Sequence, residues 1–90
     1  MKKLKTFTFT VKVEEKEVVL PPKEYSILKY LLEHKGALVE RETLLTRIWG
    51  YDYEGNERVV DNRIKNLRKE LGDAGKQIKT IITKGYRLES

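Results

Sequence analysis

Residues 57–72 read ERVVDNRIKNLRKELG, and this stretch decides the fold. Its apolar residues recur at the spacing of one face of an α-helix, and they are Val60, Ile64, Leu67 and Leu71. At about 100° per residue, the opposite face carries basic and amide side chains. These are Arg58, Asn62, Lys65, Asn66 and Lys69, with Arg63 and Arg68 on the flanks. The pattern predicts a helix over about residues 57–71, closed by Gly72.

The outward face of this helix has the side chains that suit a DNA major groove. Lys and Arg contact phosphates or guanine, and Asn can pair bidentately with adenine. A solvated helix face more often mixes Glu with Lys, whereas the acids here are Asp61 near the start and Glu70 near the end. Taken alone, the stretch is also compatible with an ordinary amphipathic surface helix, so the rest of the chain must decide.

Two more helices are predicted upstream. Pro22 presets a helix start and Gly36 supplies a stop, which places the first helix at about 22–34. Its apolar stripe is Tyr25, Leu28, Leu31 and Leu32, with Ile27 beside it. The second helix spans about 41–49 and ends at Gly50, and its apolar face is Leu44, Leu45, Ile48 and Trp49. We expect Trp49 in the core as a large apolar anchor.

Short strands are predicted on both sides of the helices. Alternation over 6–11, extendable to Val13, predicts one half-buried strand, and 16–20 predicts its partner after a turn at 14–15. Residues 38–39 are a candidate β-bridge. Near the C-terminus, 78–83 predicts a strand that turns at 83–85 and returns with Tyr86 and Leu88 pointing inward.

Length and composition indicate one small globular domain. Ninety residues, 39% hydrophobic and 37% charged, suffice for a single core, so we expect one domain over 1–90. No apolar run approaches the roughly 18–20 residues of a membrane span, and the basic start lacks the apolar core of a signal peptide. The absence of Cys excludes disulfides and thiolate metal sites and fits a reducing cytoplasm.

The positive charge is concentrated in the last third of the chain. The net charge is +5, and residues 58–90 hold nine basic and four acidic groups. This asymmetry favours a polyanionic partner.

The residue inventory argues against an enzyme. With no Cys and one His, the chain lacks Cys–His pairs and the usual zinc ligand sets, so we expect no catalytic residues, metal or cofactor. Ser26 and His34 lie too far apart along one predicted helix to hydrogen-bond. The glycines are isolated and form no phosphate-binding loop.

The order of elements predicts an α+β fold of the winged helix-turn-helix type. An N-terminal antiparallel sheet is followed by three helices and a C-terminal β-hairpin wing. In that geometry the third helix enters the major groove, and the hairpin at 78–88 lies along the backbone or minor groove. We therefore expect a sequence-specific double-stranded DNA-binding domain.

The residues also resemble a known family, the DNA-binding (effector) domains of OmpR/PhoB-type response regulators. The resemblance rests on VVLPPKEYSILKYLLEHKGALVERETLLTRIWGYDY, then ERVVDNRIKNLRKELGD, then IKTIITKGYRLES, and covers about residues 6–89. It implies a four-stranded N-terminal sheet and transcriptional regulation in a two-component system through direct-repeat promoter sites. No receiver domain is recognised in these residues. We expect a cytoplasmic protein, monomeric when free and able to form a tandem dimer on DNA.

The resemblance also implies roles for single residues. Arg58 matches a phosphate-contacting position, and Thr80 matches a DNA-backbone contact at the base of the wing. Positions that contact bases or phosphates are matched by Arg63, Lys65, Asn66 and Arg68. The loop over 50–57 matches one that touches RNA polymerase in some activators. The candidate DNA-binding set consists of the matched residues Arg58, Arg63, Lys65, Asn66, Arg68 and Thr80, the outward Asn62 and Lys69, and the wing-tip Lys84.

This chain departs from the family pattern at several positions. The wing arginine that commonly reaches the minor groove is Ile82 here, so Lys84 or Arg87 must supply any charge. Asn62-Arg63 replaces the usual Val-His, and the family's site preferences therefore do not transfer. Pro21 and Glu40 stand where Thr and Ser caps are common, which costs each helix about 1 kcal/mol.

Two other functions are compatible with these residues. A winged helix can serve as a protein-interaction module with weak, non-specific DNA binding, and the loop tyrosines Tyr51 and Tyr53 allow this without indicating it. Single-stranded RNA binding ranks last, because Phe7 and Phe9 are the only candidates for an aromatic platform.

Overall fold

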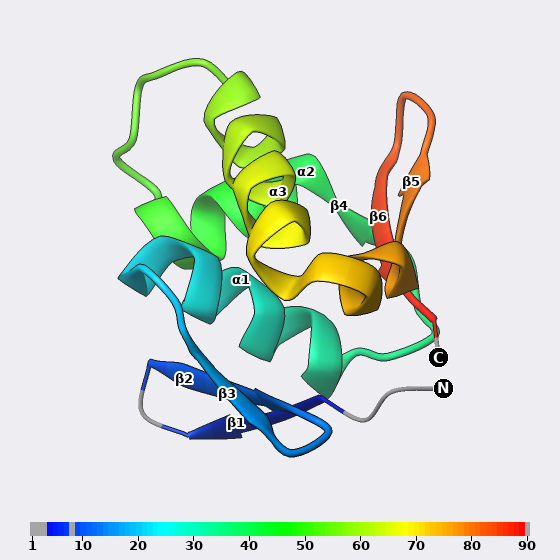
Figure 1. Cartoon of the computed structure of the whole chain (residues 1–90). Coiled ribbons are helices and arrows are strands. Elements are labelled where there is room, and N and C mark those ends of the chain that lie inside the picture. The colour runs from blue at the N-terminus through cyan, green and yellow to red at the C-terminus, as the bar shows by residue number, and fades with distance from the viewer. Residues whose placement is uncertain (1–3, 8, 90) are drawn as a thin grey trace.

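The computed structural model describes residues 4–7 and 9–89, without the side chains of 5–7. Two small antiparallel sheets flank a set of helices (Figure 1). The first sheet has the order β1 (Leu4–Phe7), β2 (Thr10–Val13), β3 (Lys16–Val19), and the second has the order β4 (Val39–Glu40), β6 (Gly85–Leu88), β5 (Ile78–Ile81). The helices are α1 (Pro22–Glu33), α2 (Arg41–Leu44), η1 (Leu45–Trp49), α3 (Arg58–Leu71) and η2 (Gly72–Gln77). The expected α+β winged helix is confirmed.

The prediction of one strand over 6–11 is wrong. The chain reverses between β1 and β2, where Phe9 has a φ of 55°; residue 8 of the predicted strand lies outside the described residues. Alternating Phe and Thr continue the strand pattern through this turn, and no Gly or Asn signals the left-handed backbone. The second predicted strand and the turn at 14–15 are confirmed as β3 and the β2–β3 turn. The described residues form three strands here, where the resemblance implied four.

Helix α1 confirms its prediction to within a residue. It ends at Glu33, and His34 follows as the cap, with its Nδ1 2.9 Å from the carbonyl oxygen of Tyr30. Gly36 then takes a φ of 87° and stops the helix.

The second predicted helix is divided. Only α2 is α-helical, and η1 is a π-helix in which the N–H of Gly50 donates to the carbonyl oxygen of Leu45 at 3.2 Å. The wider turn changes which side chains point inward. Leu44 is fully buried, whereas Trp49 is only partly buried at the edge of the core. The expectation of a core tryptophan is therefore met only in part.

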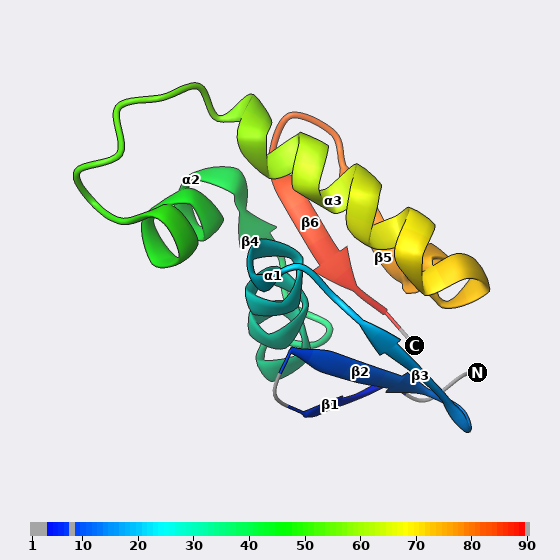
Figure 2. The same ribbon diagram turned by 60° about the vertical axis from the view of Figure 1, so that its left-hand side comes forward.

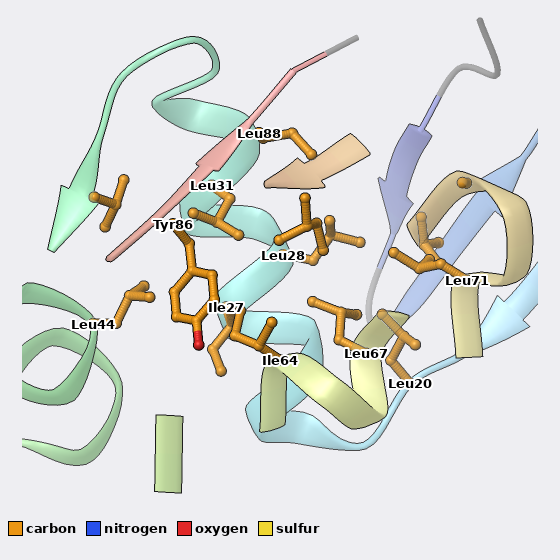
Figure 3. Packing of buried hydrophobic residues seen from close by; sticks show 14 of the residues in the cluster. Leu20, Ile27, Leu28, Leu31, Leu44, Ile64, Leu67, Leu71, Tyr86 and Leu88 are labelled. Carbon is orange, nitrogen blue, oxygen red and sulfur yellow. The ribbon is translucent and has the colours of Figure 1, made fainter. Parts of the chain in front are cut away.

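The core lies between α1, α3 and the inner faces of both sheets (Figure 3). The predicted apolar stripe of α3 is buried at all four positions. Tyr86 and Leu88 of β6 point inward as expected and pack near Ile27, Leu28 and Leu31 of α1. This packing fixes the inner face of α3 and turns its polar face outward.

The C-terminal hairpin is held close to β4. A Cβ atom at Gly85 would lie 2.1 Å from the carbonyl oxygen of Val39, so only glycine permits this pairing. The turn falls at 82–84, one residue earlier than predicted, and Thr83 has a φ of 62°. The polar link over 73–77 forms part of the 3-10 helix η2.

Candidate nucleic-acid interface

Helix α3 presents its polar face to solvent along one side of the molecule. Figures 1 and 2 show α3 on the outside, with the β5–β6 hairpin running beside it and the turn of the hairpin next to its N-terminal half. Five side chains of the candidate set are exposed along it, namely Arg58, Asn62, Lys65, Asn66 and Lys69. The other exposed residue of α3 is an acid, Glu70, near the C-terminal end of the helix. The face therefore offers cationic and amide donors together on one regular scaffold.

The first turn of α3 is capped from the preceding loop. The side-chain Oδ1 of Asn56 accepts a hydrogen bond from the backbone N–H of Arg58 at 2.8 Å. Glu57, which directly precedes the helix, makes no such cap. Asn56 thereby fixes the helix start at the point where Arg58 emerges.

Two arginines of the candidate set turn toward the protein. Arg63 donates from Nη1 to Oε1 of the buried Glu24 on α1 at 3.2 Å. Arg68 donates from Nε and Nη2 to the carbonyl oxygen of Ile78, at 3.2 and 2.7 Å, and from Nη2 to Oγ1 of Thr80 at 2.8 Å. Its guanidinium also lies 5.7 Å from the ring centroid of Tyr86. Arg63 thus ties α3 to α1, and Arg68 ties α3 to the wing.

Asp61, the acid in the first turns of α3, is neutralised by its neighbours. Its Oδ2 accepts from Nη1 of Arg41 at 3.0 Å, and its Oδ1 accepts from the hydroxyl of Tyr86. The pKa of Tyr86 is raised to about 12, chiefly by burial and then by the hydrogen bond to Asp61 and its charge. This carboxylate therefore opposes an approaching polyanion less than its charge alone suggests.

The wing tip is mostly uncharged. Ile82, which stands where the family has arginine, is 80% exposed, and Lys84 is exposed beside it. The N–H of Lys84 donates to the carbonyl oxygen of Ile81 at 2.9 Å and closes the turn. Thr80 is exposed, but its hydroxyl already accepts from Arg68. Of the wing residues in the candidate set, Lys84 offers the positive charge.

The loop over 50–57 projects away from the helices (Figure 2). Its two tyrosines differ: Tyr51 is 91% exposed, whereas Tyr53 lies 6.3 Å from Trp49, measured between ring centroids. Tyr51 is thus the tyrosine of this loop that a partner could meet.

Sequence reasoning missed two residues that shape this surface, Glu24 and Arg41. Glu24 sits on the same stripe of α1 as Ile27, Leu28 and Leu31, and a charged residue at such a position signals a buried partner. No comparable signal marked Arg41, because its partner Asp61 lies 20 residues away.

Other kinds of site find little support in the part of the chain described. Those residues contain no group of three or more His, Cys, Asp or Glu side chains that could hold a metal ion. Among the same residues, every helix is too short or too polar to cross a bilayer.

Comparison with known proteins assigns this chain to a family. A family model described as "Transcriptional regulatory protein, C terminal" matches residues 15–88. The alkaline phosphatase synthesis transcriptional regulatory protein PhoP of Bacillus subtilis is 42% identical over 79 residues, which are 84% of this chain and 33% of PhoP. The chain thus spans about a third of the length of this curated relative.

Solved structures agree with this match. The response regulator DrrB, a Thermotoga maritima OmpR/PhoB homologue, superposes with a TM-score of 0.82 at 37% identity, over 97% of this chain and 44% of DrrB. The DNA-binding domain of Klebsiella pneumoniae RstA, solved in complex with the RstA box, has a TM-score of 0.79 at 31% identity, over 97% of both chains.

Proposed function

The chain belongs to the family of C-terminal domains of transcriptional regulatory proteins, of the OmpR/PhoB type, and from this premise we propose that it binds specific double-stranded DNA sequences through α3. Family members regulate transcription and are not enzymes. The observation that carries the proposal is the exposed row of Arg58, Asn62, Lys65, Asn66 and Lys69 on one face of a 14-residue helix. The RstA domain was solved in complex with the RstA box, which supports DNA as the partner of this chain.

The two kinds of side chain on this face have different tasks. Arg58, Lys65 and Lys69 supply positive charge for phosphates, and Asn62 and Asn66 supply paired donors and acceptors for base edges. The hairpin lies along the backbone or minor groove, with Lys84 at its tip as the phosphate contact. Thr80 acts on DNA mainly by fixing Arg68.

The wider role follows from the family. We propose that the chain acts in a cytoplasmic response regulator of a two-component system and recognises direct-repeat promoter sites. It is monomeric when free and pairs in tandem on DNA. The exposed Tyr51 supports contact between the loop over 50–57 and RNA polymerase.

The test is selection of binding sites from a random double-stranded DNA library, followed by affinity measurement at two salt concentrations. We expect one enriched motif, with log K falling by about 0.9 per phosphate neutralised as log salt rises. Enrichment of no motif, with weak binding lost at higher salt, would contradict specific readout. The winged-helix protein-interaction module would then be the better assignment.

A further inference from the structure

Glu24 is a carboxylate buried on the core-facing side of α1. It is 2% exposed and lies on the same face as Ile27 and Leu28, which are fully buried. A buried charge is costly unless it is paired. The ion pair that the described residues give it is the one with Arg63 of α3.

Helix α1 leaves this carboxylate available to another element. Glu24 is the third residue of α1, the position from which a glutamate commonly reaches back to the N–H of the capping residue. The capping residue here is Pro21, which has no N–H. The carboxylate is therefore directed to α3 and not to its own helix end.

Arg63 combines this inner contact with a partly exposed side chain. It lies between the exposed residues Asn62 and Lys65, and its own side chain is 42% exposed. A guanidinium has five N–H donors in a planar fork, and the bond to Glu24 uses Nη1. The N–H donors on the opposite edge of the guanidinium remain available to bind a ligand on the α3 face.

Building on the proposed function, we propose that Glu24 is a positioning residue for DNA readout. Its carboxylate holds one edge of the Arg63 guanidinium, so that the other edge meets the DNA in a single orientation. A side chain held in place before binding loses less rotamer freedom and discriminates more sharply between base edges. Glu24 thus determines how strongly Arg63 distinguishes sequences, although it does not touch the DNA.

The experiment compares site selection and affinities for the wild-type chain, Glu24→Gln, Arg63→Gln and the double variant. Glu33→Gln is the control, because it removes the same charge from an exposed position on the same helix. Thermal unfolding of each variant identifies a temperature at which all of them are folded. We expect Arg63→Gln to relax the preference at one base position about tenfold, in the range of a lost base contact. Glu24→Gln should relax the same position, the double variant should be no worse than Arg63→Gln, and Glu33→Gln should match the wild type.

Three results would overturn the proposal. Glu24→Gln could lower the unfolding temperature and leave every base preference unchanged, which is the signature of a merely structural pair. Arg63→Gln could weaken all sequences equally, or the effects of the two variants could add. A wild-type chain that enriches no motif would instead overturn the proposed function itself, and the positioning role with it.

Discussion

Arg58 and Arg68, both on α3, have different roles. Arg58 is exposed at the first turn, where helix N–H groups and a cation together favour a phosphate. Arg68 is held by the carbonyl of Ile78 and the hydroxyl of Thr80, so Nε and Nη2 of its guanidinium are already engaged within the protein. Spacing on the helix wheel placed both in one candidate set, and only the fold distinguishes the DNA-facing arginine from the one that braces the wing.

Replacing Arg58 should weaken binding without changing its specificity. We expect Arg58→Ala to lower the affinity for every sequence by a similar factor and to reduce the salt slope by about 0.9. Asn66→Ala is the contrasting variant, since a lost base contact costs about 1–3 kcal/mol at one position and little elsewhere. Titrations of the selected site and its single-base variants at two salt concentrations measure both effects. Base-specific losses from Arg58→Ala would contradict the phosphate role.

Tyr86 should make stability depend on pH in the alkaline range. Its pKa is raised from 10.0 to about 12, first by burial and then by Asp61. A raised folded-state pKa stabilises the protein below the unfolded pKa, and this contribution is lost as the pH rises from about 10 through 12. We expect the free energy of unfolding of the wild type to fall over that range by roughly 2 kcal/mol more than that of Tyr86→Phe. Denaturant unfolding of both proteins at several pH values measures the difference, and parallel curves would contradict it.

Close backbone approach holds the wing against the helices. The short strand β4 pairs with β6 and leads directly into α2. Arg41, which follows β4, donates a hydrogen bond to the carboxylate of Asp61 on α3. Neither α1 nor α2 has a side-chain hydrogen bond at its N-terminal cap, as expected from Pro21 and Glu40. The placement of these elements therefore depends on packing and pairing more than on capping.

The pairing of β4 with β6 should not tolerate a side chain at position 85. In Gly85→Ala, the new Cβ would meet backbone atoms of Val39 and Glu40 at 2.1 and 2.8 Å, so the strands must separate. We expect a loss of about 3 kcal/mol in the free energy of unfolding. Gly36→Ala is the matched control, because no atom lies within 4 Å of its Cβ and only a φ of 87° opposes it. Its expected cost is about 1 kcal/mol, and equal losses in urea unfolding would refute the steric argument.

Most of the architecture could be predicted from the sequence, because helical periodicity and glycine stops are local signals. The stripe of α3 and the end of α1 were predicted this way, and the inward Tyr86 was predicted from the strand pattern of the C-terminal hairpin. The turn at Phe9 and the π-helix over 45–49 were not, because neither has a characteristic residue pattern. Pairings across long sequence separations, such as Glu24 with Arg63, depend on the assembled fold. The outward face of α3 could be predicted from the sequence, whereas its inner anchors could not.

Charge position, and not net charge, should control DNA binding by the whole molecule. The molecule extends 39 × 24 × 20 Å, several times the screening length of about 8 Å at physiological salt. Lys65 and Lys69 lie on the α3 face, whereas Lys29 and Lys35 are exposed on α1 and the turn after it. We expect Lys65→Gln with Lys69→Gln to weaken binding of the selected site about 100-fold and to lower the salt slope by about 2. Lys29→Gln with Lys35→Gln removes the same charge and should weaken binding less than about twofold. Equal losses in the two double variants would show that the basic chain attracts DNA without a defined face.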